Sequence, residues 1–425
     1  MKTSPPIVQL PFRRGAVEYA LANEADQEAV YQTLLHVFHA PDRETFLGSL
    51  SEPSYRPDQR LLVKVDGRIA SHVQLTSRTV RYGSVDLPMY GLTWVGTLPE
   101  YRGLGFAQNL IRLADDRARS SDVPLLTASS PMARFYRALG WGVCGRQTMA
   151  RIASRNLPAT GGDGLVEAKG GHWHVRPWRQ VEISDLMNLY NRQFAHTTGS
   201  LVRDEDYWRW IIGRKYAHVI WVACQGEKVR GYAFVKDYKI LEIATDPAHP
   251  QALRALLGRV RAEALERAYP EVVIHAPIDH PVYESVRQGQ GRILDNEEHD
   301  GQTSLYHAAS PEKFLTAILP ELNRRVVQAG QSLPFELGLH LGDHRWLIRL
   351  DPKANKLEPD KLGRRYLTLS PGAFIRLAMG HTGIDRALAG EDDGEASTAT
   401  AVEAARVLFP ATPIWRSPLD AATTS

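Results

Sequence analysis

A glycine-rich turn decides the fold of this chain: Gly96-Thr97-Leu98-Pro99-Glu100-Tyr101-Arg102-Gly103-Leu104-Gly105-Phe106-Ala107. Before it, residues 89–95 are rich in aromatic and branched side chains and carry no charge, which is typical of a strand buried on both faces. After it, apolar residues recur at helical spacing from 107 to 118. Glycines let a backbone approach a ligand, and the first amides of a helix lack intrahelical acceptors. The turn is therefore predicted to bind a pyrophosphate.

Two familiar phosphate loops do not fit this turn. A nucleoside-triphosphate loop would need Gly-Lys-Ser/Thr, which the turn lacks. A dinucleotide loop would need an acidic ribose-binding residue downstream, and none stands at the expected place; the turn also lies roughly 95 residues into the chain. A plain helix N-cap turn remains the structural alternative.

The order Arg102-x-x-Gly105-x-Ala107 after Pro99 resembles the acyl-coenzyme A loop of the GNAT superfamily of N-acetyltransferases, written Gln/Arg-x-x-Gly-x-Gly/Ala. Residues 61–65, 69–75 and 80–87 are predicted to be successive antiparallel strands that lead to it. The resemblance implies acetyl-coenzyme A (acetyl-CoA) as acyl donor. Amides at 95–97 would hold the pantetheine arm and polarise the thioester carbonyl, and amides at 103–108 would hold the pyrophosphate. The implied cofactor-binding residues are Val95, Gly96, Thr97, Arg102, Gly103, Leu104, Gly105, Phe106, Ala107, Gln108, Ser129 and Ser130.

A tyrosine follows the next predicted strand, residues 123–130. Phe135-Tyr136 precedes Gly140-Trp141-Gly142, which is also the GNAT order. In that family the tyrosine lies beside the thioester sulfur, so the resemblance implies that Tyr136 is the catalytic general acid. A phenol with a reference pKa of ~10 can donate a proton to a departing thiolate at neutral pH. The alternative is a tyrosine that packs its ring and leaves its hydroxyl in water.

No base is apparent beside this loop. An attacking amine with a pKa of ~10.4 must first lose a proton. Residues 88–98 contain neither Asp nor Glu, and Glu100 lies in the turn itself. The base is therefore expected elsewhere in the chain.

The length of 425 residues predicts about three domains. Residues 156–164 and 169–171 are poor in apolar side chains and predict a linker. From 173 to 306 the order of elements starts again, and Tyr283 with Gly289-Gln290-Gly291 repeats the layout around Tyr136. In this second copy the loop 245–251 has two prolines and no glycine, so it is predicted not to hold coenzyme A.

The last section, from Pro311, combines a hairpin at 335–341 and 345–350 with helices on both sides of it in the sequence. This pattern resembles the sterol carrier protein fold. The predicted fold class is therefore mixed α/β (α+β). It comprises a catalytic GNAT domain at 1–155, a degenerate GNAT-like domain at 172–308 and a sterol carrier protein-like domain at 311–425.

This order of domains looks like the Eis-like (enhanced intracellular survival) family of N-acetyltransferases. The resemblance implies hexamers, and amine acceptors such as aminoglycosides, polyamines or lysine side chains. It also implies that the terminal carboxylate, here that of Ser425, is the catalytic base. Such family members end in an apolar or aromatic residue, whereas this chain ends in a small polar tail. Asp420 and a water molecule are therefore the alternatives.

Composition bears on the expected location, metal content and partners of the protein. Cys144 and Cys224 match no metal spacing, and a reducing cytoplasm is the expected location. His340 and His344 fall on a hairpin, so no metal is predicted. The net charge of +3 does not indicate a nucleic-acid partner, and no apolar run approaches the ~20 residues of a membrane span. The rival interpretation is a non-catalytic module that binds coenzyme A or lipid, and the intact loop at 102–107 argues against it.

Overall fold

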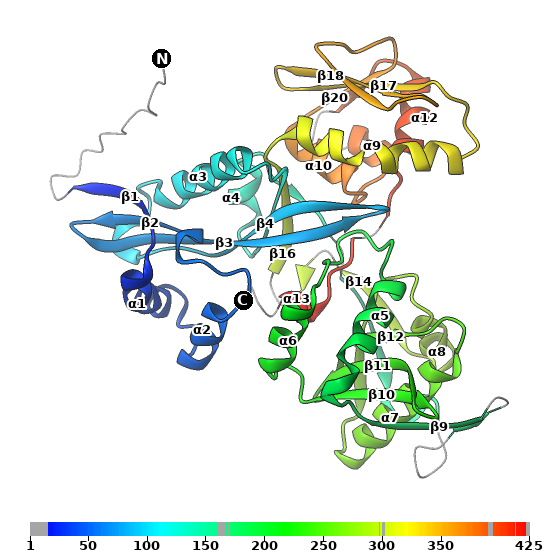
Figure 1. Ribbon diagram of the computed structural model, residues 1–425. Coiled ribbons are helices and arrows are strands. Elements are labelled where there is room, and N and C mark those ends of the chain that lie inside the picture. The colour runs from blue at the N-terminus through cyan, green and yellow to red at the C-terminus, as the bar shows by residue number, and fades with distance from the viewer. Residues whose placement is uncertain are drawn as a thin grey trace.

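The computed structural model describes residues 16–145, 147–159, 166–168, 171–296, 298–299, 302–389, 394–412 and 414–421. These residues form three sheets, each with its own layer of helices (Figure 1). Ser425 and the rest of the C-terminal tail lie outside the described residues. None of the described helices is both long enough and apolar enough to cross a membrane.

The first sheet has the strand order β1-β2-β3-β4-β5-β16-β15, and β6 also pairs with β16. Helices α1 and α2 cover one face, and α3 and α4 cover the other (Figure 1). The strands are β1 (Val17–Leu21), β2 (Arg60–Val65), β3 (Arg68–Tyr82), β4 (Val85–Thr97), β5 (Leu125–Ser130), β6 (Gly142–Val143), β15 (Glu298–His299) and β16 (Gln302–Ala308). The helices are α1 (Gln27–Phe38), α2 (Arg43–Leu50), α3 (Phe106–Ser120) and α4 (Ala133–Arg137).

The second sheet repeats this arrangement in the order β14-β7-β13-β12-β11-β10-β9-β8. Its parallel pair, β12 with β13, corresponds to β4 with β5 of the first sheet. The strands are β7 (Gln147–Ala153), β8 (Val166–Ala168), β9 (Gly171–Pro177), β10 (Val219–Gln225), β11 (Lys228–Lys236), β12 (Lys239–Thr245), β13 (Glu271–His275) and β14 (Arg292–Asn296). The helices are α5 (Ile183–Gln193), α6 (Glu205–Gly213), α7 (Gln251–Glu266) and α8 (Val282–Gln288).

The two sheets exchange one strand each. Strand β7, which follows the first sheet's β6 in the chain, lies between β13 and β14 of the second sheet. Strand β16, which follows the second sheet's β14, lies between β5 and β6 of the first. Each sheet is therefore completed by a strand that comes from the other half of the sequence, so the predicted segments 1–155 and 172–308 share their sheets.

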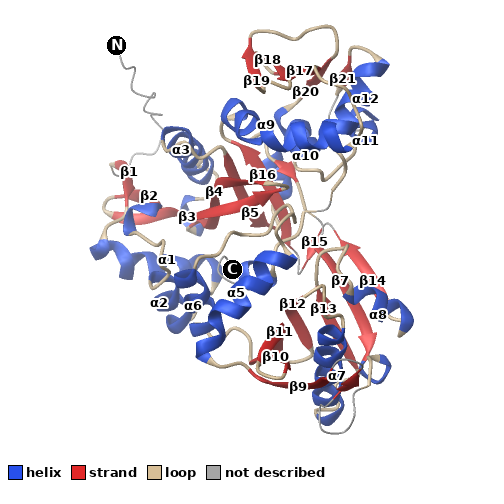
Figure 2. Cartoon of the chain, turned by 45° about the vertical axis from the view of Figure 1, so that its right-hand side comes forward, coloured by secondary structure: helices blue, strands red, loops and turns tan. Residues whose placement is uncertain are grey.

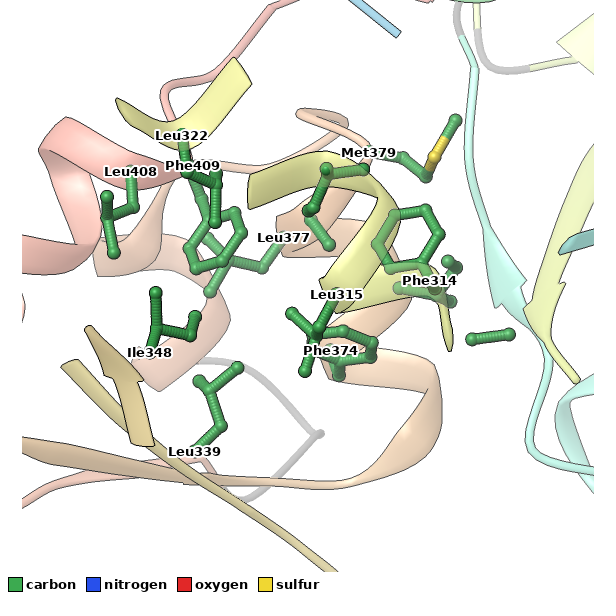
Figure 3. Packing of buried hydrophobic residues seen from close by; sticks show 14 of the residues in the cluster. Phe314, Leu315, Leu322, Leu339, Ile348, Phe374, Leu377, Met379, Leu408 and Phe409 are labelled. Atoms are coloured by element: carbon green, nitrogen blue, oxygen red, sulfur yellow. The ribbon is translucent and has the colours of Figure 1, made fainter. Parts of the chain in front are cut away.

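The third sheet has the order β19-β18-β17-β20-β21 and carries its helices on one side (Figures 1 and 2). The strands are β17 (Phe335–Leu341), β18 (His344–Leu350), β19 (Lys356–Pro359), β20 (Tyr366–Leu369) and β21 (Glu395–Ala396). The helices are α9 (Pro311–Gln328), α10 (Pro371–Ala378), α11 (Ile384–Ala389) and α12 (Ala399–Leu408). Phe314 and Leu315 of α9 meet Phe374 of α10 and Leu339 of β17 in its core (Figure 3).

The hairpin of β3 and β4 reaches the third sheet. The sequence predicted strands at 69–75 and 80–87, but the structure has one continuous β3 to Tyr82, a turn at Gly83 and Ser84, and β4 from Val85. The predicted strand boundaries were wrong because the turn lies between residues that all have strand character. Gly83 gives the turn its left-handed conformation, with a φ of 56°. The tip of the hairpin packs into the same core as α9, which joins the first and third sheets.

The C-terminal segment joins the first two sheets. It ends in α13 (Pro418–Ala421), and Trp415 just before it stacks on Phe194, with 4.7 Å between ring centroids. Trp415 and Leu419 belong to the core that α5 and α6 form against the second sheet.

Candidate active site

The site lies where β4 and β5 separate. The two parallel strands pair from Met89 with Leu125 to Leu92 with Ala128, and the pairing ends there. On the other side of β4, the register with β3 shifts, so that Trp94 and Val95 have no partner residue in β3. Trp94 has a φ of 54°, in the left-handed region, which marks a β-bulge. The bulge turns the end of β4 away from β5 and opens a gap between them.

A cavity of about 610 Å³ occupies this gap. It is lined by β4, the turn after it, the start of α3, the end of β5, α4 and the end of α1. The lining residues are Val37, Phe38, Val95, Gly96, Thr97, Tyr101, Arg102, Gly103, Gly105, Phe106, Ala107, Gln108, Ser130, Met132, Phe135 and Tyr136. Among these described residues Arg102 is the one that carries a full charge at neutral pH.

The turn before α3 borders the cavity with an anion cradle. Gly103 and Gly105 have φ values of 80° and 78°, in the left-handed region that residues other than glycine rarely adopt. A Cβ atom at either position would meet no atom within 4 Å, so the space beside the turn is open. The first main-chain bond of the helix runs from the Asn109 amide to the Gly105 oxygen at 3.0 Å. The amides of residues 106–108 precede that bond, so they have no acceptor inside the helix and can bind phosphate oxygens.

Tyr136 of α4 also lines the cavity. Its side chain is buried against Phe135 and Trp141, whose ring centroids lie 5.3 Å and 5.2 Å from its own. Burial raises the pKa of the Tyr136 phenol well above its usual range. The phenol therefore stays protonated at neutral pH and can act as a hydrogen-bond or proton donor.

The end of α1 forms another part of the cavity wall. Gly96 has to be a glycine because a Cβ atom there would lie 2.7 Å from Val37 Cγ1 and 2.8 Å from the Phe38 ring. Phe38 in turn meets Trp94 edge-on, with 5.3 Å between centroids. This close contact closes the cavity on the α1 side with apolar groups.

Residues 18–144 match the protein-family model of the acetyltransferase (GNAT) domain. The chain therefore contains a GNAT domain. The match covers β1 to the end of β6, and thus the bulge, the anion cradle and Tyr136.

Three solved structures are similar over nearly the whole chain. The first is a conserved protein of unknown function, a probable N-acyltransferase, from Enterococcus faecalis V583, with a TM-score of 0.75, 15% identity, and coverage of 95% of this chain and 99% of that one. A GCN5-related N-acetyltransferase from Anabaena variabilis ATCC 29413 has a TM-score of 0.72, 16% identity, and coverage of 94% and 99%. Eis1 from Mycobacterium abscessus has a TM-score of 0.67, 15% identity, and coverage of 94% and 99%. At such low identity these likenesses show a shared fold. No curated protein matched the sequence.

The GNAT domain brings most of the sequence-predicted residues to one cavity. Leu104 and Ser129 are the exceptions, because Leu104 packs on the core of the first sheet and Ser129 pairs with Ser304 of β16. Sequence reasoning missed Val37, Tyr101, Met132 and Phe135 as lining residues. The obligatory Gly96, two residues after the left-handed Trp94, is the local signal that another element approaches β4 closely.

Two carboxylates considered as the base, Asp420 and Glu100, are engaged in other contacts. Asp420 is buried and accepts two hydrogen bonds from Arg203 at 2.9 Å, and Arg203 also holds Glu242 at 2.7 Å. Glu100 lies 3.3 Å from Arg68 at the surface. Neither Asp420 nor Glu100 lines the cavity, so neither is placed to act as the base. Ser425, the other predicted base, lies outside the described residues.

The corresponding turn of the second sheet carries its own anion. Asp246 follows β12, and its carboxylate accepts the Ala248 amide at 3.1 Å and pairs with Arg230 at 3.0 Å. Pro250 immediately precedes α7. A carboxylate thus occupies an amide that a phosphate would need. Among the described residues no group of three or more His, Cys, Asp or Glu side chains is arranged to hold a metal ion.

Proposed function

We propose that the protein is an acetyl-CoA-dependent N-acetyltransferase that acts on a primary amine. The observation that carries the proposal is one cavity that combines an anion cradle at residues 103–108, main-chain donors at 95–97 and a protonated Tyr136. These three features match the chemical needs of the pyrophosphate, the pantetheine arm and the thioester of acetyl-CoA. The open space beside Gly103 and Gly105 fits such a ligand.

In this proposal the Val95 amide and Tyr136 have separate roles in acyl transfer. Bound acetyl-CoA supplies an activated acyl thioester. The Val95 amide donates to the acyl oxygen while negative charge develops there, as the amine nitrogen bonds to the acyl carbon. Tyr136 gives its proton to the sulfur as the carbon–sulfur bond breaks, and it regains one from solvent. The surplus proton of the amine passes to water in this scheme, because no described carboxylate lines the cavity.

Calorimetric titration with acetyl-CoA tests the binding step, with two matched variants. Gly105→Glu puts a carboxylate into the anion cradle. Gly67→Glu is the control, because Gly67 has the same φ of 78° and the same open surroundings but does not line the cavity. We expect binding of about one acetyl-CoA per chain in the wild type and the Gly67 variant, and no binding in the Gly105 variant. Equal binding by both variants would contradict the assigned cradle.

A thiol-release assay then tests transfer and acceptor class. We propose an aminoglycoside, a polyamine or a lysine side chain as acceptor, since the domain order resembles the Eis-like family. The panel should also include an aromatic amine, because Phe38 and Phe135 line the cavity while no described carboxylate does. Binding without thiol release from any amine would support the rival function, a non-catalytic module that binds coenzyme A or lipid.

Three further proposed properties of the protein rest on the resemblance to the Eis-like family. We propose that the assembly is a hexamer, that the location is the cytoplasm and that the section from Pro311 is sterol carrier protein-like. The hairpin of β17 and β18 with α9, α10 and α12 on one side supports the last point. Sedimentation of the purified full chain would test the hexamer directly.

A further inference from the structure

Arg60 is a buried cation whose partners do not neutralise it. It begins β2 and is 1% exposed, and its guanidinium packs over the rings of Phe46 and Tyr55. Its Nε donates to the Tyr55 hydroxyl at 3.2 Å, and its Nη2 has no hydrogen-bond partner. Within the described ranges no carboxylate forms an ion pair with it. A buried charge without a counter-charge is costly, so its presence requires a reason.

Among the described residues, the guanidinium of Arg60 has one further hydrogen-bond partner, His72 on the neighbouring strand β3. The Arg60 Nη1 lies 3.1 Å from His72 Nε2, and the His72 Nδ1 lies 2.9 Å from the Trp94 carbonyl oxygen. A guanidinium can only donate, so His72 Nε2 must accept, and the imidazole proton must sit on Nδ1. Burial and the nearby guanidinium lower the pKa of His72 to about 3, which keeps the ring neutral. His72 therefore donates its Nδ1–H to Trp94.

The bonded carbonyl belongs to the peptide group that carries the Val95 amide. This peptide bond is trans, and in a planar trans peptide the C=O and the N–H point in opposite directions. With its oxygen fixed toward His72, inside the protein, the group directs its N–H to the opposite side, where β4 has separated from β5. Val95 has no partner residue in β3 or β5 and lines the cavity. The direction of this N–H is therefore set by His72.

The hydrogen bond from His72 to the Trp94 carbonyl also makes the Val95 N–H a stronger donor. A hydrogen bond to a carbonyl polarises its peptide group and makes the N–H a stronger donor, and the effect adds along a chain of hydrogen bonds. Here the chain runs from the Arg60 cation through His72 and the Trp94 carbonyl to the Val95 amide. The uncompensated charge of Arg60 thus lies at the far end of a relay that ends in the cavity.

We propose that Arg60 and His72 are positioning residues that aim the Val95 N–H at the acyl oxygen and strengthen it as negative charge develops there. The inference rests on the proposed acetyl transfer, and it adds two side chains that do not touch the ligand. It also gives the strained conformation of Trp94 a use, because the bulge is what frees the Val95 amide from the sheet.

Two isosteric variants of His72 separate the two contacts. In His72→Asn the amide nitrogen takes the place of Nδ1, so the bond to Trp94 is kept and the bond to Arg60 is lost. In His72→Gln the amide reaches Arg60, but no donor stands at the Nδ1 position. A merely structural role would make the two variants similar, whereas the proposal ranks them.

Steady-state kinetics on the full chain give the first readout. For His72→Gln we expect kcat to fall roughly tenfold, less than the ~100-fold lost when a whole donor is removed, with KM for acetyl-CoA changed less than about twofold. For His72→Asn we expect a smaller loss, because it keeps the contact that aims the amide and gives up only the contribution of Arg60. Equal losses in both variants, or an unchanged kcat in His72→Gln, would overturn the proposal.

Hydrogen exchange in residues 93–98 gives a second readout that needs no substrate. The bulge should exchange faster in His72→Gln than in His72→Asn, and equal exchange would count against the positioning role. If the wild type neither binds acetyl-CoA nor releases thiol, the proposed function fails while this contrast still decides whether His72 fixes the bulge. If His72→Gln does not fold, Arg60→Met and Arg60→Lys are compared in place of the two His72 variants. A kcat of Arg60→Met equal to that of Arg60→Lys would then overturn the relay.

Discussion

At the scale of single residues, the site depends on protonation states that burial fixes. Tyr136 is buried among aromatic rings and keeps its proton, and His72 is buried beside a cation and stays neutral. Both side chains can therefore serve as hydrogen-bond donors at neutral pH. Removing one hydroxyl while keeping the ring should separate chemistry from packing.

Tyr136→Phe keeps the ring that packs on Phe135 and Trp141 and removes only the phenolic proton. We expect turnover to fall by roughly 100-fold, at the lower end of general-acid contributions, with acetyl-CoA affinity nearly unchanged. Thiol-release kinetics and calorimetry measure the two quantities. Tyr90→Phe is the control, because Tyr90 lies on β4 but does not line the cavity. Unchanged turnover in Tyr136→Phe would refute the acid role.

At the scale of elements, the short α13 is held by a buried ion cluster rather than by its length. Arg203 binds Asp420 of α13 and Glu242 of β12, and all three side chains are inaccessible to solvent. The Tyr232 hydroxyl donates to Glu242 at 2.9 Å and completes the cluster. The segment after α12 is therefore fixed to the second sheet by charge as well as by Trp415.

Arg203→Met would leave two buried carboxylates without their cation. We expect a loss of about 3–5 kcal/mol in the free energy of unfolding, which is typical of breaking a buried ion pair from one side. Denaturant unfolding of the full chain measures it. Arg209→Met removes an exposed pair with Glu205 on α6 and should cost less than about 0.5 kcal/mol. Similar losses in the two variants would show that the cluster does not stabilise the fold.

At the scale of the whole molecule, three units are joined by shared parts. Strands β7 and β16 are exchanged between the first two sheets, and the β3–β4 hairpin carries the first sheet into the third. At the hairpin tip, Glu321 of α9 accepts the Ser84 amide at 3.0 Å and the Ser84 hydroxyl at 2.8 Å. Arg324 and Arg325 pair with the same carboxylate.

These contacts predict an acid dependence of the junction. Burial opposes ionisation of Glu321, but the arginines and Ser84 outweigh it and lower its pKa to about 2, from a usual value of 4.5. Because the folded-state pKa is the lower one, the carboxylate stabilises the fold above pH 4.5, and the stabilisation is lost as pH falls from 4.5 toward 2. Its size at neutral pH is about 2 kcal/mol, after a reduction for the partial exposure of Arg324.

Glu321→Gln tests this dependence through melting temperatures of the full chain across pH. The variant should melt lower than the wild type at pH ~7, and the difference should shrink below the usual pKa of 4.5. Glu284→Gln, at an exposed pair with Arg287, is the control. A difference that stays constant down to pH ~2 would show that Glu321 is not the titrating group.

Much of the fold could be predicted from local patterns. The helix after the glycine turn, the hairpin at 335–350 and the repeated order around Tyr283 all appear in the structure. The turn at Gly83 was missed because residues on both sides of it have strand character. Of the cavity lining, most residues of the glycine-rich turn were identified, except Tyr101. Val37 and Met132 come from other elements and carry no motif.

The sequence by itself determined the GNAT domain and its anion cradle, because glycine conformations and unpaired helix amides are properties of a few neighbouring residues. It also predicted that the corresponding turn of the second sheet is unsuited to a phosphate, since two prolines remove amides there. Only the tertiary structure decided the exchange of β7 and β16, because a strand pairs with whichever edge the whole chain brings to it. It alone placed Arg60 and His72 behind the Trp94 carbonyl, since the direction of a peptide group depends on contacts between strands and not on sequence spacing.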